Sequence, residues 1–304
     1  MNDLVIHKHF LQSKLWREVK ENLGNKTFDF QNGWFQTTKL PVLNKFVGYA
    51  PRIDIDNTNF DTLVQVAKET NCIFVKVDPN NYHSDFRAIS HKYNIKKSKP
   101  VHLQKDILVD LTLGEEELWN RIKSKVKNKI NKPRNDGCQT SFGATEENFK
   151  EFLSLYSETS ESKHFSGRGS NYLTTVWNTL GEFEKDDNET YRMIVTTKLN
   201  NRTLVSSFIF LYEGVLYYTY TGSSFAAEDR KIGASYLHVW NIFKWGSENG
   251  LKIFDFWGVE DDMTSGFSYF KTTFEGELIE YANTFDIVIN PLMYNVFNLV
   301  NKFR

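Results

Sequence analysis

The chain has 304 residues, of which 40% are hydrophobic and 15% aromatic, so it can bury a substantial core, and its length is typical of two domains. Its 37 basic and 38 acidic residues give a net charge of −1, which excludes a general attraction to nucleic acid or to anionic membranes and leaves only local patches for such binding. Two cysteines, Cys72 and Cys138, provide neither a metal-binding spacing nor a disulfide framework. The first residues lack the apolar run of a signal peptide, and no apolar cluster is long enough to cross a bilayer. We therefore expect a cytoplasmic protein with no transmembrane segment, no metal site and no cofactor.

The first third of the sequence predicts several strands, then a helix, then another strand. Residues 27–30, 34–40 and 47–53 have the pattern of strands, and Asn32-Gly33 is a tight-turn signal. A helix is expected over 58–70, followed by a strand over 72–79. Because a helical crossover joins parallel strands, this segment predicts a sheet that is antiparallel except at that connection.

The middle of the sequence predicts the link between two halves. Residues 107–119 end a strand and start a helix. The helix is expected to continue through the basic residues 121–134 and to end at Pro133 and Gly137.

The second half repeats the order of elements found in the first. Residues 191–199, 204–212 and 215–221 predict an antiparallel meander. A helix over 233–249 and a strand over 253–259 follow, with Gly250 as the helix stop.

Three motifs follow one another closely in the last third: YYTYTGS at 217–223, IFDFWGV at 253–259 and YFKTTFEGE at 269–277. Together with WREVK at 16–20, KVDP at 76–79 and GRGSNY at 167–172, this set resembles the FemABX family of peptidoglycan-precursor aminoacyltransferases. The interval between 137 and 191 has no room for a coiled-coil arm, as in the short, FemX-like members. The motif YFKTTFEGE departs from many relatives, which carry a glycine after the lysine.

The resemblance implies an α+β fold of two acetyltransferase-like (GNAT) domains, each with a mixed, mainly antiparallel sheet flanked by helices. It places the first domain at residues 1–112 plus 284–304 and the second at 113–283. It also implies a tRNA-dependent enzyme that joins an amino acid of the Gly, Ala or Ser class to the side-chain amine of a stem peptide. The implied partners are aminoacyl-tRNA and a UDP-linked or lipid-linked MurNAc-peptide, with room for peripheral association with a membrane.

The matching motif positions suggest which residues form the site. The resemblance implies substrate binding by Lys20, Arg168, Tyr172, Tyr220 and Phe270, and catalysis by Lys271 and Asp78. Lysine and the forked arginine guanidinium suit an acceptor that carries phosphates and carboxylates. Lys271 would stabilise the oxyanion of the tetrahedral intermediate, or would grip a phosphate or carboxylate.

Each of these residues also has a plain structural interpretation. The cations can be ordinary surface residues, and the two tyrosines can be core residues with satisfied hydroxyls. Asp78 lies before a proline, where a carboxylate is often only a turn residue. Because an aspartate is a weak base toward an amine, Asp78 is expected to orient the ammonium.

The basic segment at 121–134 allows two interpretations. Lys123, Lys127 and Lys129 can contact tRNA phosphates, or the helix can simply present a solvated charged face.

Two other functions stay open at this level. RKIGAS at 230–235 partly resembles the pyrophosphate loop of coenzyme-A-dependent acyltransferases, and the chain can also be a non-catalytic double-GNAT binding module. Neither cysteine has the neighbours of a nucleophile, so direct attack of the amine on the ester is expected.

Overall fold

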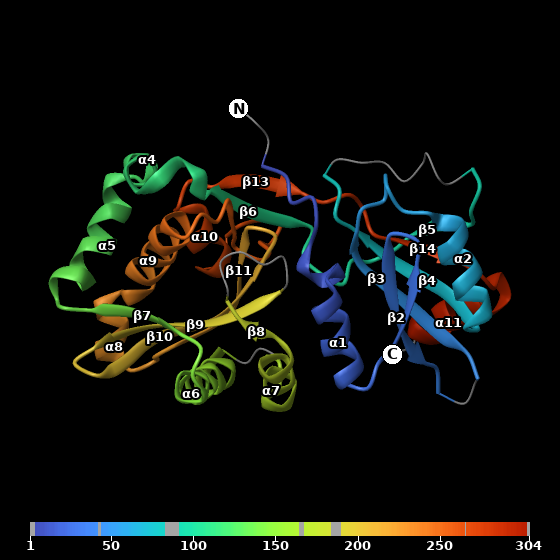
Figure 1. The fold of residues 1–304 in the computed structure, drawn as a ribbon, viewed down its shortest axis with the longest axis horizontal. Coiled ribbons are helices and arrows are strands. Elements are labelled where there is room, and N and C mark those ends of the chain that lie inside the picture. The colour runs from blue at the N-terminus through green and yellow to red at the C-terminus, as the bar shows by residue number, and fades with distance from the viewer. Residues whose placement is uncertain are drawn as a thin grey trace. The chain divides into compact units, whose positions relative to one another are not determined.

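The protein consists of two compact units, each built on one sheet (Figure 1). The computed structural model describes residues 4–41, 44–82, 91–163, 167–183, 190–264 and 266–302. The first unit comprises Val5–Gln104 and Ile279–Arg304, and the second comprises Lys105–Leu278 with Met1–Leu4. The domain boundaries predicted from the sequence, after residues 112 and 283, lie a few residues further along the chain than the boundaries of these units, after residues 104 and 278.

The first unit has a six-stranded sheet with the order β1-β2-β3-β4-β14-β5. Its strands are β1 (Lys26–Phe30), β2 (Gly33–Lys39), β3 (Phe46–Ile53), β4 (Cys72–Pro79), β5 (Ile95–Lys97) and β14 (Phe285–Val288), and its helices are the short η1 (Phe10–Gln12), α1 (Lys14–Asn22), α2 (Phe60–Glu69) and α11 (Pro291–Lys302). The last strand of the chain, β14, lies between β4 and β5 and is antiparallel to both. Residues from the two ends of the sequence therefore share one sheet.

Helix α2 connects β3 to the parallel strand β4 and begins at a side-chain cap. The carboxamide oxygen of Asn59 accepts hydrogen bonds from the first backbone N–H groups of the helix, which would otherwise lack partners. Val75 and Val77 of β4 belong to the same core cluster as α2. Phe74, on the alternate side, packs edge-on against Tyr294 of α11, with ring centroids 5.1 Å apart. Both faces of β4 are thus buried.

The second unit has an eight-stranded sheet with the order β13-β6-β12-β11-β10-β9-β7, and β8 lies beside β9. Its strands are β6 (Lys105–Asp110), β7 (Gln139–Gly143), β8 (Gly181–Glu182), β9 (Tyr191–Leu199), β10 (Arg202–Tyr212), β11 (Val215–Ser223), β12 (Ile253–Asp255) and β13 (Glu277–Glu280). Its helices are the short η2 (Leu111–Leu113), α4 (Gly114–Arg121), α5 (Ser124–Asn135), α6 (Glu146–Lys163), α7 (Ser170–Thr179), α8 (Ala227–Ile232), α9 (Ala234–Glu248) and α10 (Gly266–Thr272).

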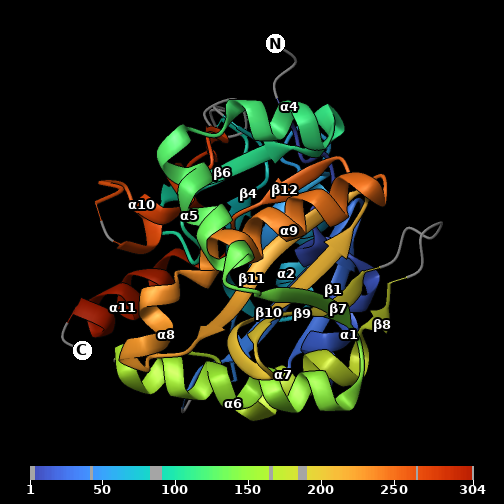
Figure 2. The same ribbon diagram turned by 90° about the vertical axis from the view of Figure 1, so that its left-hand side faces the viewer.

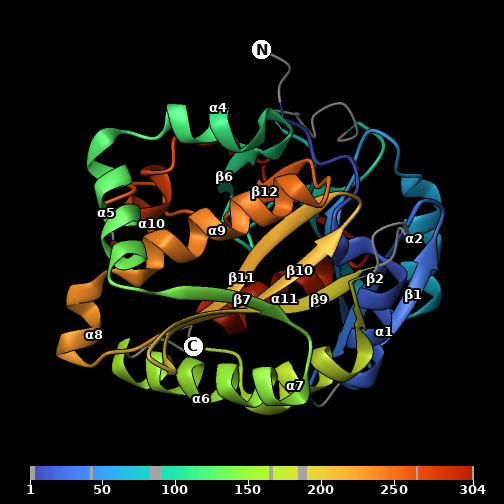
Figure 3. The same ribbon diagram turned by 60° about the vertical axis from the view of Figure 1, so that its left-hand side comes forward.

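The second sheet is covered on both faces. Helix α9 lies on one face with α5 packed against it, and α6 lies on the other face (Figures 2 and 3). The meander β9–β10–β11 is antiparallel, and α8 and α9 then lead to β12, which is parallel to β11. The first unit has the same layout at β2, β3, α2 and β4. The predicted α+β class with two acetyltransferase-like sheets is confirmed.

Two details of the link differ from the sequence prediction. Strand β6 pairs with β12, so residues 105–110 lie in the second sheet rather than at the end of the first domain. The helix predicted through 121–134 is also two helices, because Ile122 and Lys123 are extended.

The break in this helix has a packing reason. Leu118, Ile122, Val126 and Ile130 recur every four residues and are all buried in one core. In a continuous α-helix that spacing turns the apolar stripe by about 40° at each step. The break allows α4 and α5 each to pack on α9. Pro133 lies inside the last turn of α5 and does not end the helix.

A buried polar network joins α9 to the sheet. The His238 side chain is fully buried; its Nδ1 lies 2.9 Å from the Thr197 hydroxyl, and its Nε2 lies 2.8 Å from the Ser207 hydroxyl. Ser207 in turn lies 2.9 Å from the Thr221 hydroxyl. Burial lowers the pKa of His238 to about 3, so the imidazole is neutral at physiological pH. Because the Ser207–His238 pair is inaccessible, it is a structural network and not a nucleophile–base pair.

Gly222 allows close approach of β11 to α6. A Cβ atom at this position would lie 2.6 Å from the backbone nitrogen of Tyr156 and 2.9 Å from the carbonyl oxygen of Leu155. Gly222→Ala is therefore expected to lower the free energy of unfolding by about 1–3 kcal/mol, measured by urea denaturation. Gly181→Ala is the matched control, since its Cβ would lie 3.7 Å from the Tyr191 ring, an ordinary contact. Equal stability of the two variants would contradict the close approach.

Among the helices in these described ranges, none is both long and apolar enough to span a bilayer.

Candidate functional site

In the second sheet, strands β11 and β12 stop pairing at the end of β12. Strand β12 pairs with β11 only over Ile253–Asp255 against Val215–Tyr217, whereas β11 continues to Ser223. The loop at 256–258 begins where the pairing ends. Tyr220 lies on the part of β11 that continues beyond this pairing, and its side chain contacts Tyr172 of α7 and Tyr156 of α6.

Arg168, Tyr172 and Tyr220 form one cluster with Tyr156 of α6. The exposed Arg168 guanidinium lies over the Tyr172 ring, 4.9 Å from its centroid, and the Arg168 backbone N–H donates to the Tyr156 hydroxyl over 3.3 Å. The Tyr172 and Tyr220 side chains are hydrogen-bonded to each other, and the Tyr156 and Tyr220 rings meet edge to face at 6.0 Å. The sequence predicted three of these residues, and the structure brings them together.

The electrostatics of this cluster suit an anionic group. Burial raises the pKa of Tyr172, and burial together with Tyr172 raises the pKa of Tyr220 well above its ordinary value. Both phenols are therefore neutral at physiological pH, and one of their two O–H groups is already used in the hydrogen bond between them. A guanidinium stacked on an aromatic ring keeps its in-plane N–H groups available for a carboxylate or a phosphate. The arrangement can bind an acidic group of a substrate.

Lys271 lies in α10, and its side chain is only 3% exposed. The ammonium donates to three consecutive backbone carbonyls, those of Phe256 at 2.5 Å, Trp257 at 3.1 Å and Gly258 at 2.7 Å. Burial lowers the pKa of Lys271 to about 8, although the negative charges of Asp106 and Asp255 act to raise it. An ammonium has three N–H donors, so an oxyanion would have to displace one of these carbonyls. The catalytic role of Lys271 stays a prediction.

Phe270, the residue before Lys271, lies against the core. Its ring contacts Tyr236 with centroids 4.9 Å apart and Phe274 at 5.3 Å. The side chain is partly buried in the main cluster of the second unit. Its role in substrate binding also stays a prediction.

Lys20 and Asp78 belong to the first unit. The Lys20 ammonium lies 4.9 Å from the centroid of the Trp16 ring in α1. Asp78, in β4, is 1% exposed; its Oδ2 accepts a hydrogen bond from the Tyr49 hydroxyl at 2.7 Å, and its Oδ1 accepts one from the Thr284 hydroxyl. Asp78 is thus a buried acceptor of two neutral hydroxyls rather than an exposed turn residue.

The three lysines of the basic segment make different contacts. Lys123 is 73% exposed and lies 2.8 Å from the Glu275 carboxylate, whereas Lys129 donates to the Tyr236 hydroxyl at 2.9 Å. The Lys127 ammonium lies 5.5 Å from the centroid of the Trp119 ring. Two of the three cations therefore already have polar partners within the second unit.

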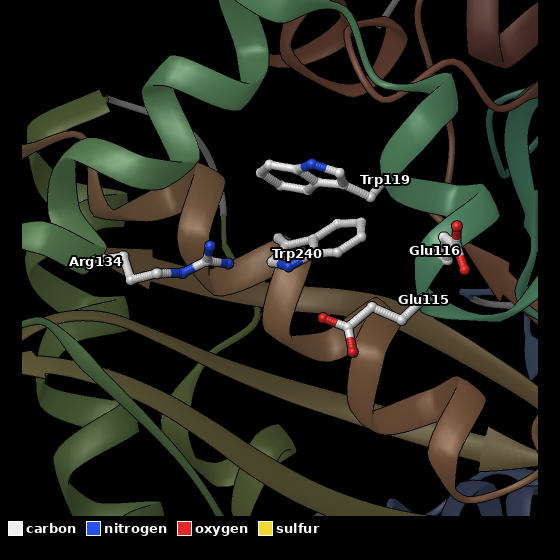
Figure 4. Close-up of a pocket in the computed structure, with 5 residues that line it drawn as sticks. All are labelled: Glu115, Glu116, Trp119, Arg134 and Trp240. Atoms are coloured by element: carbon white, nitrogen blue, oxygen red, sulfur yellow. The ribbon is translucent and has the colours of Figure 1, made fainter.

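Helices α4, α5 and α9 line a pocket of about 470 Å³ (Figure 4). The Trp119 and Trp240 rings meet edge to face, with centroids 4.9 Å apart. The Arg134 side chain lies to one side of them, and Glu115 and Glu116 lie to the other.

Replacing Lys123, Lys127 and Lys129 together by Gln is expected to weaken tRNA binding. Each tRNA phosphate that the variant no longer neutralises should flatten the dependence of log K on log salt concentration by about 0.7–0.9, measured by filter binding across a salt series. Affinity for the acceptor precursor should not change. Lys198→Gln is the control, because it removes a lysine of β9 that pairs with Glu151 of α6, outside the basic segment. An unchanged salt slope would show that the helix is a solvated face.

The sequence analysis missed four residues at this end of the second sheet: Tyr156, Asp106, Asp255 and Trp257. A signal existed for Asp255, which is a charged residue inside the apolar strand IFDF and is fully buried. Tyr156 lies on a long helix without a distinctive pattern, so only the fold could bring it to Arg168.

Comparison with known proteins is consistent with this geometry. The sequence profile of the FemAB family matches residues 97–185 and 178–302. The chain is 28% identical over 80 residues to "Aminoacyltransferase FemA" of Staphylococcus epidermidis, which covers 25% of this chain and 19% of that protein. It is 25% identical over 173 residues to a UDP-N-acetylmuramoylpentapeptide-lysine N(6)-alanyltransferase of Weissella viridescens, covering 56% of this chain and 48% of the relative. The matched part thus spans about a fifth and about half of these relatives.

The fold resembles a solved structure over nearly its whole length. The crystal structure of FemX superposes with a TM-score of 0.79, at 17% identity, and covers 95% of this chain and 94% of that one. At this identity the likeness concerns the fold alone. The family profile covers more than half of the chain, and its range includes the Arg168–Tyr172–Tyr220 cluster and Lys271. The chain belongs to the FemAB family.

Proposed function

We propose that this protein transfers an amino acid from aminoacyl-tRNA to the side-chain amine of a peptidoglycan-precursor stem peptide. Family membership supports the proposal, as do the names of two relatives, an aminoacyltransferase and a lysine N(6)-alanyltransferase. The observation that carries it is the cluster of Arg168, Tyr172 of α7 and Tyr220 of β11, an arrangement that can bind an anion. The donor implies a protein that works in the cytoplasm, and a lipid-linked acceptor would add peripheral contact with the membrane.

The reaction joins a nitrogen to a carbonyl carbon. The neutral acceptor amine attacks the ester carbon, a tetrahedral oxyanion forms, and the C–O bond to the tRNA ribose breaks as the hydroxyl takes a proton. Arg168 with Tyr172 and Tyr220 would hold a carboxylate or phosphate of the acceptor and so place the amine. Lys20 and Phe270 would add contacts to the acceptor. Asp78 could orient the acceptor ammonium only after losing the hydrogen bond from Tyr49 or from Thr284, because it is buried and both of its oxygens already accept.

One assay tests the proposal. A mixture of charged tRNAs is supplied with UDP-linked and with lipid-linked acceptor, and the products are read by mass spectrometry. We expect a mass increase equal to one residue of Gly, Ala or Ser on the acceptor, and none after ribonuclease treatment. Transfer from an acyl-coenzyme A that persists after ribonuclease would instead identify a coenzyme-A-dependent acyltransferase. Binding of the precursor without turnover from any charged tRNA would identify a binding module.

A further inference from the structure

A buried charge cluster underlies the loop that follows β12. The cluster consists of Asp106 on β6, Asp255 on β12 and Lys271 on α10, and each of these residues is at most 3% exposed. Burial raises the pKa of Asp106, and the charge of Lys271 opposes that rise. Because isolated buried charges are costly, these three groups depend on one another and on the backbone around them.

The cluster binds the backbone of the loop from both sides. The Lys271 ammonium donates hydrogen bonds to the backbone carbonyls of Phe256, Trp257 and Gly258. Asp255 Oδ1 accepts the Trp257 N–H at 2.6 Å, and the Asp106 carboxylate accepts the Gly258 N–H. Successive peptide groups of this loop are thus held by the side chains of the cluster, and β6 holds the two ends of the loop, where Phe256 N–H donates to the Ile107 carbonyl and Val259 N–H donates to the Lys105 carbonyl.

The held conformation is an uncommon one. Trp257 has a φ of +62° and Gly258 has a φ of +79°. Glycine adopts this region at no cost, but a bulky aromatic residue does not, and such residues persist only when their surroundings impose the conformation. The cluster supplies that constraint for Trp257.

The loop presents the Trp257 indole beside β11. The indole meets the Tyr217 ring edge to face, with centroids 6.2 Å apart, and the Trp257 residue stays half-buried while its neighbours are fully buried. Tyr217 is the last residue of β11 that pairs with β12. Tyr220 of the anion-binding cluster lies three residues further along the same strand. The indole is therefore placed where the two strands separate.

We propose that Asp106, Asp255 and Lys271 act together as positioning residues that hold the Trp257 indole as one wall of the transfer site. That this is a transfer site rests on the proposed function, but the placement of Trp257 can be measured without any substrate. An aromatic wall at the separation of the strands restricts the orientations of a bound acyl group and excludes water.

Fluorine NMR tests the placement directly. The sequence has seven tryptophans, and in protein labelled with 5-fluorotryptophan the Trp257 signal is assigned by its loss in Trp257→Phe. We expect Asp255→Asn to shift or broaden the Trp257 signal while the other six stay in place, which also shows that the variant is folded. Asp229→Asn, a change at a buried carboxylate on α8, is the matched control and should leave the Trp257 signal unchanged. An unmoved Trp257 signal in Asp255→Asn would overturn the proposal.

A double-mutant cycle tests whether the cluster acts through the indole. Asp255→Asn is expected to lower kcat by about 10²-fold with KM for the acceptor unchanged, the scale of a small misplacement in the site. In a Trp257→Ala background the same change should cost almost nothing, because the group that it positions is already absent. Reductions of kcat that multiply independently would overturn the proposal. If the wild-type protein transfers no amino acid while the fluorine signal still responds, the proposed function fails and the positioning role is retained.

Discussion

Replacing Lys271 by Met is expected to lower kcat by about 10²–10³-fold, the scale of losing one preorganised donor. Methionine keeps the length of the side chain but removes the charge and all three donors, so the carbonyls of Phe256, Trp257 and Gly258 lose their common partner. The reduction would follow whether the ammonium meets the oxyanion or positions the loop. Steady-state kinetics with varied acceptor give kcat and KM separately.

The Lys271 variant also loses stability. In this variant Asp106 and Asp255 stay buried without the Lys271 cation. Removing one partner of a buried ion pair lowers the free energy of unfolding by about 3–5 kcal/mol. The thermal unfolding of the variant should therefore be followed by circular dichroism first, and the kinetic assay should be run at a temperature at which the variant is folded. The double variant Lys271→Met with Asp255→Asn, which removes the cation together with one of the two carboxylates, provides a second folded form. Lys252→Met, at an exposed lysine just before β12, is the control and should retain full activity. A raised KM with unchanged kcat would make Lys271 a binding residue, and no change in either would remove it from the site.

The second unit is expected to lose stability steeply in acid because of His238. Its pKa is about 3 in the folded protein and near its ordinary value of 6.5 in the unfolded chain. Between these values only the unfolded state binds the proton, so the free energy of unfolding falls as pH falls from 6.5 toward 3. At about 1.4 kcal/mol per pH unit, the decrease across this window reaches about 5 kcal/mol.

Urea denaturation at several pH values, on the wild type and on His238→Gln, measures this effect. Glutamine keeps one donor and one acceptor for Thr197 and Ser207 but does not titrate. The difference in stability between the two proteins should therefore shrink as the pH falls. Using the difference removes the contribution of His9, whose pKa burial also lowers. A difference that is constant between pH 6.5 and pH 4 would show that His238 is accessible to protons in the folded state.

Local sequence patterns predicted most of the elements of both sheets. The strands at 191–199 and 204–212, and the crossover helix before β12, follow from short-range alternation, helical spacing and turn residues, which act over a few positions. The family resemblance rested on motifs of the same local kind, and the family profile confirms it. Arg168, Tyr172 and Tyr220 were named from these motifs, and the structure places them in one cluster.

What the sequence by itself determined was therefore most of the order of the elements, the fold class and the family. Only the tertiary structure decided the pairing of β6 with β12, the break at Ile122 and the environment of Lys271. Each of these depends on residues distant in the sequence: the ammonium of Lys271 contacts carbonyls 13 to 15 residues away and opposes the charge of Asp106 on another strand. A lysine in a motif looks the same whether its charge faces solvent, a substrate or a buried loop. Its desolvation and its partners, which decide what it does, exist only once the chain has folded.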